Sequence, residues 1–311
     1  MIDAASKAFF QAISRSAFLK LLATRYGMSG ERGFARRFIA GEHVEQVIAA
    51  ARAVETRGLA ITLDYLGESV SETPEARRAT QEYLDIVDRI VAAGIERNVS
   101  LKLSQLGLDL DPQLGLDNLR RILQRASPHG FFVRIDMESS AYTDATLDVF
   151  ETLWEEGFRQ VGVVLQSALR RSAEDLRRVT RMGARVRLVK GAYKEPRELA
   201  WQRRAEVDAA YVSLTQALLR EGTYPAFATH DPAMIAAAKT YAAEYGVRRD
   251  AFEFQMLYGI RRDLQTALAA EGYKVRVYIP FGREWFPYFM RRLGERPANV
   301  GFVIRALLKE R

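Results

Sequence analysis

Several of the apolar runs of this chain contain a cationic side chain that could bind an anionic group. Lys102 stands between two leucines, and Arg187 stands between a valine and a leucine. If these runs are strands, alternation points each cation to the face opposite its apolar neighbours, and burying a cation requires a counter-charge or a ligand. Asp136, which follows a third apolar run, supplies a negative charge. The three residues together indicate a site for an anionic ligand with an internal counter-charge.

A pair of adjacent arginines, Arg291 and Arg292, follows the last apolar run. Because each guanidinium offers parallel N–H donors, such a pair can clamp a carboxylate or a phosphate. The alternative is a solvated helix face, where Glu295 forms an ordinary ion pair with these arginines. The aromatic residues of this stretch either close an apolar pocket or belong to the core. They are Tyr278, Phe281, Trp285, Phe286, Tyr288 and Phe289.

The segment Lys190, Gly191, Ala192 places a cation directly before two residues with little or no side chain. Such a backbone lets an anionic cofactor approach main-chain N–H groups closely. By itself this is weak evidence, because glycine after a strand is common in turns.

Eight short apolar runs, several of them rich in β-branched residues, alternate with amphipathic stretches of helical periodicity. Eight βα units predict an α/β protein with a (β/α)8 barrel of the TIM type. A doubly wound sheet is the alternative, but no GxGxxG fingerprint follows any of the runs. The runs are 59–63, 99–103, 131–135, 161–165, 186–189, 226–228, 252–256 and 275–279.

The carboxyl ends of the strands of such a barrel converge on one face, which carries the catalytic groups. We therefore expect the polar residues on or after all eight runs to meet at that face, although any one of them could be a helix cap. The set comprises Asp64, Glu68, Lys102, Ser104, Arg134, Asp136, Glu138, Gln166, Arg187, Lys190, Thr229, His230, Asp231, Glu253, Gln255, Arg276 and Tyr278.

The length and composition fit one barrel with an extension. Of the 311 residues, 48% are hydrophobic and 27% are charged, which is typical of a globular protein with a sizeable core. Residues 1–57 show helical spacing and predict an N-terminal helical arm, and residues 58–311 would form the barrel as a single functional domain. The start of the chain lacks a signal peptide, and no apolar run reaches about 18 residues, so we expect a cytoplasmic protein.

Composition also excludes several kinds of chemistry. The chain has no cysteine, which rules out disulfides, thiolate catalysis and cysteine-ligated metals. Its three histidines are far apart in the sequence, so no metal site is expected. The net charge of +7 is modest and spread along the chain, which gives little support for a nucleic-acid partner.

Taken in order, the strand ends resemble those of the proline dehydrogenase family, specifically its short monofunctional bacterial members. The resemblance covers all eight predicted strands. The matching stretches are LDYLGE (63–68), SLKLSQLGLD (100–109), VRIDME (133–138), VLQS (164–167), RLVKGAYKEP (187–196), FATHDP (227–232), FEFQMLYGIR (252–261) and VYIPFGREWFPYFMRRLGERPAN (277–299).

The resemblance implies a distorted barrel that holds FAD non-covalently, with FMN as the alternative flavin. It implies oxidation of L-proline to Δ1-pyrroline-5-carboxylate by hydride transfer to flavin N5, the first step of proline catabolism to glutamate. Electrons would pass to a quinone, with peripheral contact at the inner face of the membrane. The sequence has no counterpart of the aldehyde dehydrogenase domain of the long bifunctional enzymes, so a separate pyrroline-5-carboxylate dehydrogenase would take the product.

The resemblance also implies roles for individual residues. The catalytic positions are matched by Lys102, Asp136, Arg187, which would lie near flavin N5, and Tyr278. The positions that hold the substrate are matched by Lys102, Tyr288, Arg291, Arg292 and Glu295, with the two arginines on the carboxylate. The FAD-contacting positions are matched by Met137, Gln166, Arg187, Lys190, Gly191, Ala192, Thr229 and His230. Glu68 is a candidate gate that would pair with Arg291 over the bound substrate.

Two other functions remain as alternatives. A Schiff-base aldolase on the same barrel would use Lys102 or Lys190, because lysines at strand ends can be activated by neighbouring cations. A basic nucleic-acid-binding protein would use the positive net charge, but the sequence contains no recognised binding motif for it.

Overall fold

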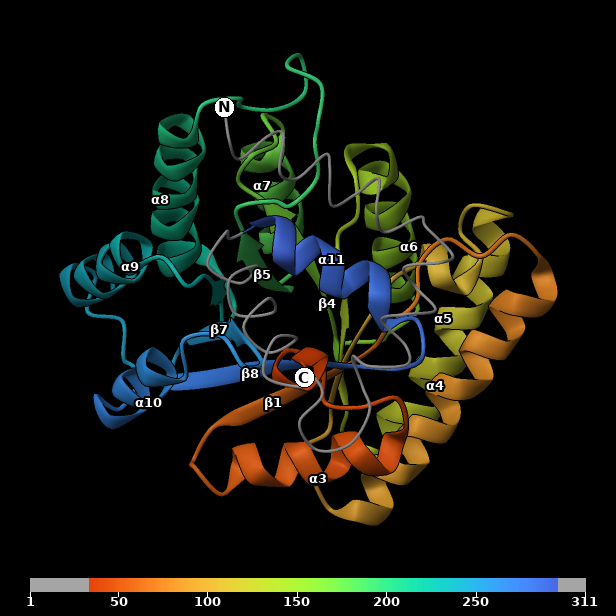
Figure 1. The fold of residues 1–311 in the computed structure, drawn as a ribbon. Coiled ribbons are helices and arrows are strands. Elements are labelled where there is room, and N and C mark those ends of the chain that lie inside the picture. Colours follow the sequence, from red (N-terminus) through yellow and green to blue (C-terminus); the bar gives the residue numbers. More distant parts are fainter. Residues whose placement is uncertain (1–33, 296–311) are drawn as a thin grey trace.

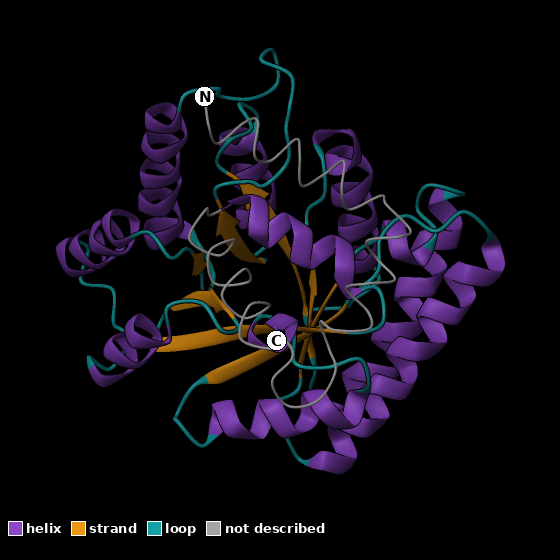
Figure 2. Ribbon diagram, in the orientation of Figure 1, coloured by secondary structure: helices purple, strands orange, loops and turns teal. Residues whose placement is uncertain are grey.

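The computed structural model describes residues 34–295 of the chain, and the side chains of residues 34–290. Eight parallel strands close into a barrel in chain order, and helices surround it (Figures 1 and 2). The predicted (β/α)8 barrel is therefore confirmed. The strands are β1 (Ala60–Tyr65), β2 (Asn98–Leu101), β3 (Phe132–Ile135), β4 (Val161–Gln166), β5 (Arg185–Val189), β6 (Ala226–Ala228), β7 (Glu253–Leu257) and β8 (Lys274–Phe281).

Each helix follows a strand of the barrel, apart from α3, which precedes the first strand. The helices of the described chain are α3 (Val44–Glu55), α4 (Thr73–Ala93), α5 (Pro112–Ala126), α6 (Thr143–Glu155), α7 (Ser172–Arg181), α8 (Arg204–Glu221), α9 (Pro232–Glu244), α10 (Arg262–Ala270) and α11 (Trp285–Glu295). Of the predicted arm, α3 and the preceding 3-10 turn Phe34–Arg37 are described, and residues 1–33 lie outside the described chain.

The barrel lumen contains polar side chains, and the hydrophobic core lies between the strands and the helices. Arg187 of β5 donates a hydrogen bond from Nη2 to Ser100 Oγ of β2 at 2.9 Å, and these two strands are not neighbours in the ring. The contact therefore crosses the lumen. Val186 and Leu188 alternate with Arg187 and so face the helices, where they are fully buried.

A charge network lies inside the N-terminal half of the barrel. Arg276 donates from Nε to Glu253 Oε1 and from Nη1 to Glu96 Oε1, each at 2.7 Å. Arg276 pairs in register with Ala60, the first residue of β1. Arg134 lies in the same half of the barrel, because its Nη1 donates to the carbonyl oxygen of Arg185, the first residue of β5.

The expectation that all eight strands send their polar residues to one face is therefore wrong for Arg134, Glu253 and Arg276. Each strand contributes inward side chains along its whole length, so a polar residue early in a strand faces the opposite end of the lumen from one at its carboxyl end. The strands are only three to eight residues long, so the position of a polar residue within its predicted run did not show which end of the lumen it would face.

The segment after the 3-10 turn fastens α11 to the barrel. Ala40 N–H donates to the carbonyl of Pro280 at 2.9 Å, and Trp285 Nε1 donates to Glu42 Oε1 at 3.0 Å. The rings of Phe38 and Phe289 lie 6.1 Å apart. In Figure 1, α11 crosses the ring of strands, so these contacts position a helix over the barrel.

The aromatic residues around α11 are core rather than an open pocket. Trp285, Phe286 and Phe289 are at most 3% exposed. Within residues 34–295, the helices lack a stretch long and apolar enough to cross a membrane.

The N-terminal charge network makes a stability prediction. We expect Glu253→Ala to lower the free energy of unfolding by about 3 kcal/mol, because it removes two hydrogen-bonded contacts from buried Arg276. The matched control is Asp88→Ala, which removes an exposed pair with Arg125 and should cost less than about 1 kcal/mol. Urea unfolding of the three proteins measures the difference, and equal losses in the two variants would contradict the prediction.

Candidate functional site

Asp136, the first residue after β3, is held by groups from two other strands. Arg187 Nη1 of β5 donates to Asp136 Oδ1 at 2.5 Å, and the Tyr278 hydroxyl of β8 donates to Oδ2 at 2.7 Å. The guanidinium of Arg187 also lies over the Tyr278 ring, 5.3 Å from its centroid. The structure thus brings together three of the predicted catalytic residues, with both carboxylate oxygens of Asp136 accepting a hydrogen bond.

Desolvation and the negative charge of Asp136 raise the pKa of Tyr278 well above its usual value. The phenol therefore stays protonated at neutral pH and remains a hydrogen-bond donor to Asp136. Tyr278 is therefore the donor of this hydrogen bond and Asp136 is the acceptor.

Arg187 is fixed on several sides and is only 4% exposed. Ser100 accepts from Nη2, and the hydroxyl of Thr62 lies 3.4 Å from the hydroxyl of Ser100. The guanidinium is therefore held in place, but its Nε, which is buried, has no hydrogen-bond partner among the described residues.

Lys102, the fourth predicted catalytic residue, pairs with Asp64 instead of Asp136. It is the first residue after β2, where the sequence had placed it inside the strand. Its Nζ lies 3.7 Å from Oδ1 of Asp64, and both residues are buried. Neither oxygen of Asp64 has a hydrogen bond within the described residues, and burial raises the pKa of this carboxyl although the charge of Lys102 acts to lower it.

Sequence reasoning had placed Asp64 among the polar residues at the strand ends without giving it a role of its own, and it had not singled out Ser100. The available signal for Asp64 was alternation, because it lies two residues after Thr62 in β1 and so faces the same lumen. Ser100 had no distinguishing signal, since a serine in a strand is common and its contact with Arg187 joins residues 87 positions apart.

A second buried carboxylate, Glu138, anchors the loop after β1. Glu138 accepts from the backbone N–H of Ser104 at 3.1 Å and from its hydroxyl at 2.5 Å, and burial raises the pKa of this carboxyl. The hydroxyl oxygen of Ser104 in turn accepts from the N–H of Ser69 at 3.1 Å. Glu68, the gate candidate, is therefore attached next to this cluster, and its charge acts to raise the pKa of both Asp64 and Glu138.

The predicted flavin-contacting residues lie at the ends of β3, β4, β5 and β6. Gln166 donates from Nε2 to the carbonyl of Glu138 at 2.8 Å, which ties the end of β4 to the segment after β3, where Met137 is buried. Gly191 has a φ of +115°, and a side chain there would approach Gln166 Oε1 and Ala168 within 3.2 Å. The position therefore requires glycine and leaves the backbone beside Gln166 open.

Three further members of this set make contacts of their own. Lys190 Nζ donates to Asp231 at 2.8 Å and also to Asp208. The hydroxyl oxygen of Thr229 accepts from the N–H of Asp231 at 3.0 Å. His230 Nε2 accepts from the N–H of Leu257 at 3.0 Å, so this nitrogen carries no proton.

The predicted substrate residues of α11 are described in part. Tyr288 is 8% exposed and lies in the first half of the helix. Arg291, Arg292 and Glu295 belong to the second half of α11, and their side chains lie outside the described residues. Their assignment stays a prediction.

Comparisons with known proteins identify close relatives. The proline dehydrogenase family model matches residues 47–305. Proline dehydrogenase of Deinococcus radiodurans is 45% identical over 279 residues, which cover 88% of this chain and 90% of the relative. Proline dehydrogenase 2 of Bacillus subtilis is 39% identical over 302 residues, covering 97% of this chain and 98% of the relative.

A solved structure is similar as well. It is proline utilization A (PutA) from Bdellovibrio bacteriovorus inactivated by N-propargylglycine, with a TM-score of 0.79 and 29% identity over 84% of this chain. This chain spans 32% of that longer protein.

The pair of Lys102 and Asp64 predicts a pH-dependent stability defect. In Lys102→Met, Asp64 loses its counter-charge and the pKa of its carboxyl rises further above the unfolded value. An acid with a raised folded-state pKa destabilises the fold increasingly as pH rises above its unfolded pKa. We expect a loss of about 3 kcal/mol in the free energy of unfolding near pH 8 and a smaller loss near pH 5.

The control for this prediction is the double variant Lys102→Met with Asp64→Asn, which removes the buried charge and should recover most of the loss. Urea unfolding at the two pH values measures both effects. A defect that is the same at both pH values, or that Asp64→Asn leaves unchanged, would show that the ion pair is not its cause.

Proposed function

The chain belongs to the proline dehydrogenase family and oxidises proline to Δ1-pyrroline-5-carboxylate, and we propose that it does so with FAD held non-covalently at the carboxyl ends of the strands. The observation that supports this most is the cluster of Asp136, Arg187 and Tyr278, which converges from three strands at that end of the lumen. The division into an arm (1–57) and a barrel (58–311) is part of the same proposal.

The residues at the strand ends fit a flavin. Arg187 offers a buried, unused Nε donor, and the open backbone at Gly191 lets a planar or anionic group come close to main-chain N–H groups. When bound, the flavin supplies the acceptor for the hydride. The residues that would hold it are Met137, Gln166, Arg187, Lys190, Gly191, Ala192, Thr229 and His230.

Lys190 would contribute less charge to a diphosphate than its type alone suggests, because Asp208 and Asp231 already share its ammonium group. The backbone N–H groups after it then become the main contacts for phosphate. Phosphate contacts of this kind favour FAD over FMN only if the adenine half of the cofactor is also bound. FMN therefore stays the alternative.

The substrate carboxylate would be bound by Lys102 together with Arg291 and Arg292 of α11. Lys102 is aimed by its buried partner Asp64 at the end of the lumen. Tyr278 and Tyr288 would shape the pocket around the ring, and Glu295 would complete the α11 side. Binding at the carboxylate end fixes which ring carbon faces the acceptor.

Asp136 acts as a positioning residue in this proposal. Both of its oxygens accept hydrogen bonds from Arg187 and Tyr278, which leaves it poorly placed to take a proton from the substrate amine. The lone pair of that amine must be available for hydride removal, so proline would bind with its nitrogen already deprotonated. Asp136 then fixes the Arg187 guanidinium beside the reacting atoms.

Further parts of the proposal concern access and electron flow. Glu68, on the loop anchored by Ser104, would pair with Arg291 and close the site over bound proline. The electrons would leave to a quinone through peripheral contact at the inner face of the membrane. A separate pyrroline-5-carboxylate dehydrogenase would then take up the product.

The aldolase alternative fits the structure less well. A Schiff base forms from a neutral amine, and carboxylates favour the charged ammonium form. Lys102 faces buried Asp64, and Lys190 is shared by two aspartates.

The cofactor and substrate are tested together by absorbance. We expect the purified protein to absorb at about 450 nm, as an oxidised flavin does. Adding L-proline without oxygen should bleach this band. D-Proline is the matched control and should bleach it far more slowly, because its carboxylate points away from the clamp when its ring is in place. Chromatography of the released cofactor distinguishes FAD from FMN. A colourless protein, or covalent trapping of a carbonyl substrate by borohydride, would contradict the proposal.

The positioning role of Asp136 predicts a turnover defect that a loss of stability does not explain. We expect Asp136→Ala to lower kcat about a hundredfold, because the Arg187 guanidinium loses the partner that orients it. Because buried Arg187 loses its counter-charge, the melting temperature should also fall, so kcat is measured per bound flavin on folded protein well below that temperature. Asp144→Ala on the surface serves as the matched control. Normal turnover in a folded, flavin-loaded Asp136→Ala variant would refute the role.

A further inference from the structure

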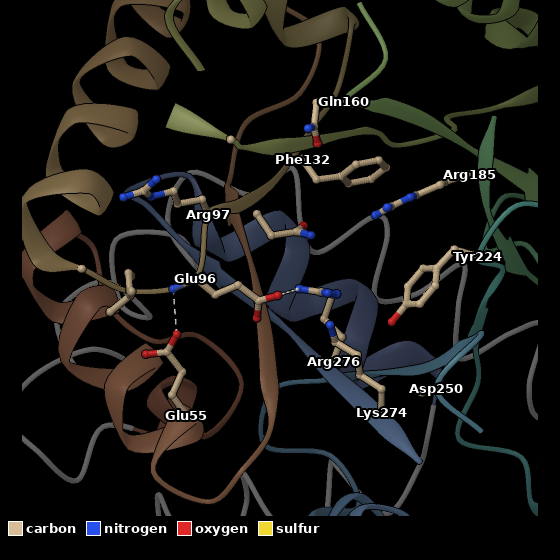
Figure 3. Close-up of a pocket in the computed structure, with 14 residues that line it drawn as sticks. Glu55, Glu96, Arg97, Phe132, Gln160, Arg185, Tyr224, Asp250, Lys274 and Arg276 are labelled. Carbon is tan, nitrogen blue, oxygen red and sulfur yellow. Dashed lines mark hydrogen bonds and ion pairs between the residues drawn. The ribbon is translucent and has the colours of Figure 1, made fainter. Parts of the chain in front are cut away.

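A hollow of about 790 Å³ opens at the N-terminal end of the barrel, away from the site around Asp136 (Figure 3). Arg185 is the first residue of β5 and Lys274 is the first residue of β8, so the wall that they line lies at the start of the strands. Its volume is in the range of small-molecule pockets, but its lining is polar rather than apolar. Its lining includes Phe132, Arg185, Tyr224 and Lys274.

Cations and aromatic rings are interleaved along one wall of this hollow. The guanidinium of Arg185 lies 5.1 Å from the ring centroid of Phe132 and 5.0 Å from that of Tyr224. Lys274 Nζ lies 5.8 Å from the Tyr224 ring, and the buried Arg134 lies 4.8 Å from the Phe132 ring. Such contacts hold a cation in one orientation without neutralising it.

Two of these cations have no carboxylate partner within residues 34–290, namely Arg185 and Lys274. The acidic residues of the lining are already engaged, since Glu96 pairs with Arg276 and Asp250 pairs with Arg248. Glu55 accepts from the backbone N–H of Glu96 on the opposite wall. Figure 3 shows the Arg185 guanidinium projecting into the hollow between Phe132 and Tyr224.

Tyr224 keeps this wall in place at a conformational cost. Its φ is +47°, which is unfavourable for a residue with a side chain, and it directly precedes Pro225, which disfavours helical conformations at that position. The Tyr224 hydroxyl donates to Glu253 Oε2 at 3.3 Å, which ties the ring to the buried charge network. The Tyr224 ring, which orients Arg185 and Lys274, is thus itself held by its hydrogen bond to Glu253.

We propose that this hollow is a binding site for a small, non-aromatic metabolite that carries a phosphate or carboxylate group. The guanidinium of Arg185 offers parallel N–H donors to two oxygens of that group, and Lys274 adds a second positive charge. A nucleotide base is disfavoured, because cations already lie over both rings. The polar remainder of the ligand faces Asn98 and Gln160.

The site does not include any residue of the proline dehydrogenase chemistry, so it can be tested separately. Isothermal titration of the flavin-loaded, full-length protein with inorganic phosphate, pyrophosphate or citrate, at constant ionic strength, measures binding. The variants are Arg185→Gln and Lys274→Gln. Arg249→Gln is the matched control, since Arg249 is an exposed arginine near the same end that lies 5.1 Å from the Tyr273 ring.

We expect saturable binding of one molecule of at least one probe, weakened tenfold or more in Arg185→Gln and in Lys274→Gln and unchanged in Arg249→Gln. A preference for pyrophosphate would identify a phosphoryl ligand, and a preference for citrate a carboxylate. Proline oxidation without the probe should be the same in all four proteins. Lack of saturable binding, or equal binding by both site variants and the wild type, would overturn the proposal even if the enzyme oxidises proline as described.

Discussion

The ion pair between Arg187 and Asp136 lies inside the ring of strands, where both charges are largely withdrawn from water. Such a pair is stable only if hydrogen bonds satisfy the remaining donors and acceptors. Tyr278 and Ser100 supply most of these contacts, and they come from β8 and β2, the two neighbours of β1. The cost of leaving a buried charge without partners therefore constrains four strands at once, and only Nε of the Arg187 guanidinium has no hydrogen-bond partner among the described residues.

Because the lumen is polar, the barrel is divided into two ends with different tasks. At the N-terminal end, Arg276, Glu253 and Glu96 satisfy one another. At the carboxyl end, Lys102 pairs with Asp64 and Arg187 pairs with Asp136, and these pairs belong to the proposed site. The apolar residues that would fill an ordinary barrel lumen face the helices instead, so the hydrophobic core surrounds the strands and stabilises the ring from outside.

The segment around Phe38 and Glu42 connects the arm to this arrangement. Its contacts with Trp285 and Phe289 fix α11, the helix on which the proposed arginine clamp is carried. The approach is close enough that the backbone of Arg37 excludes any side chain at Gly259. The described part of the arm thus helps to determine where the substrate end of the site lies, although it contributes no predicted catalytic residue.

The sequence alone determined the fold class and most of the proposed site. Eight apolar runs separated by helical stretches specify a barrel, because each run needs a neighbour for its backbone and a helix for its apolar face. The order of strand-end residues pointed to the proline dehydrogenase family, and placed Asp136, Arg187 and Tyr278 in one site. These inferences depend on local periodicity and on residue type, which are properties of the chain itself.

Tertiary structure decided which polar residues share an end of the lumen and which pair with each other. Arg134, Glu253 and Arg276 resemble the site residues in sequence but lie at the opposite end, since register and strand length set the depth of an inward side chain. Lys102 pairs with Asp64, 38 positions earlier in the chain, and Arg187 reaches Ser100 across the lumen. Contacts between distant residues depend on the closure of the ring, which brings together strand ends that no local pattern relates.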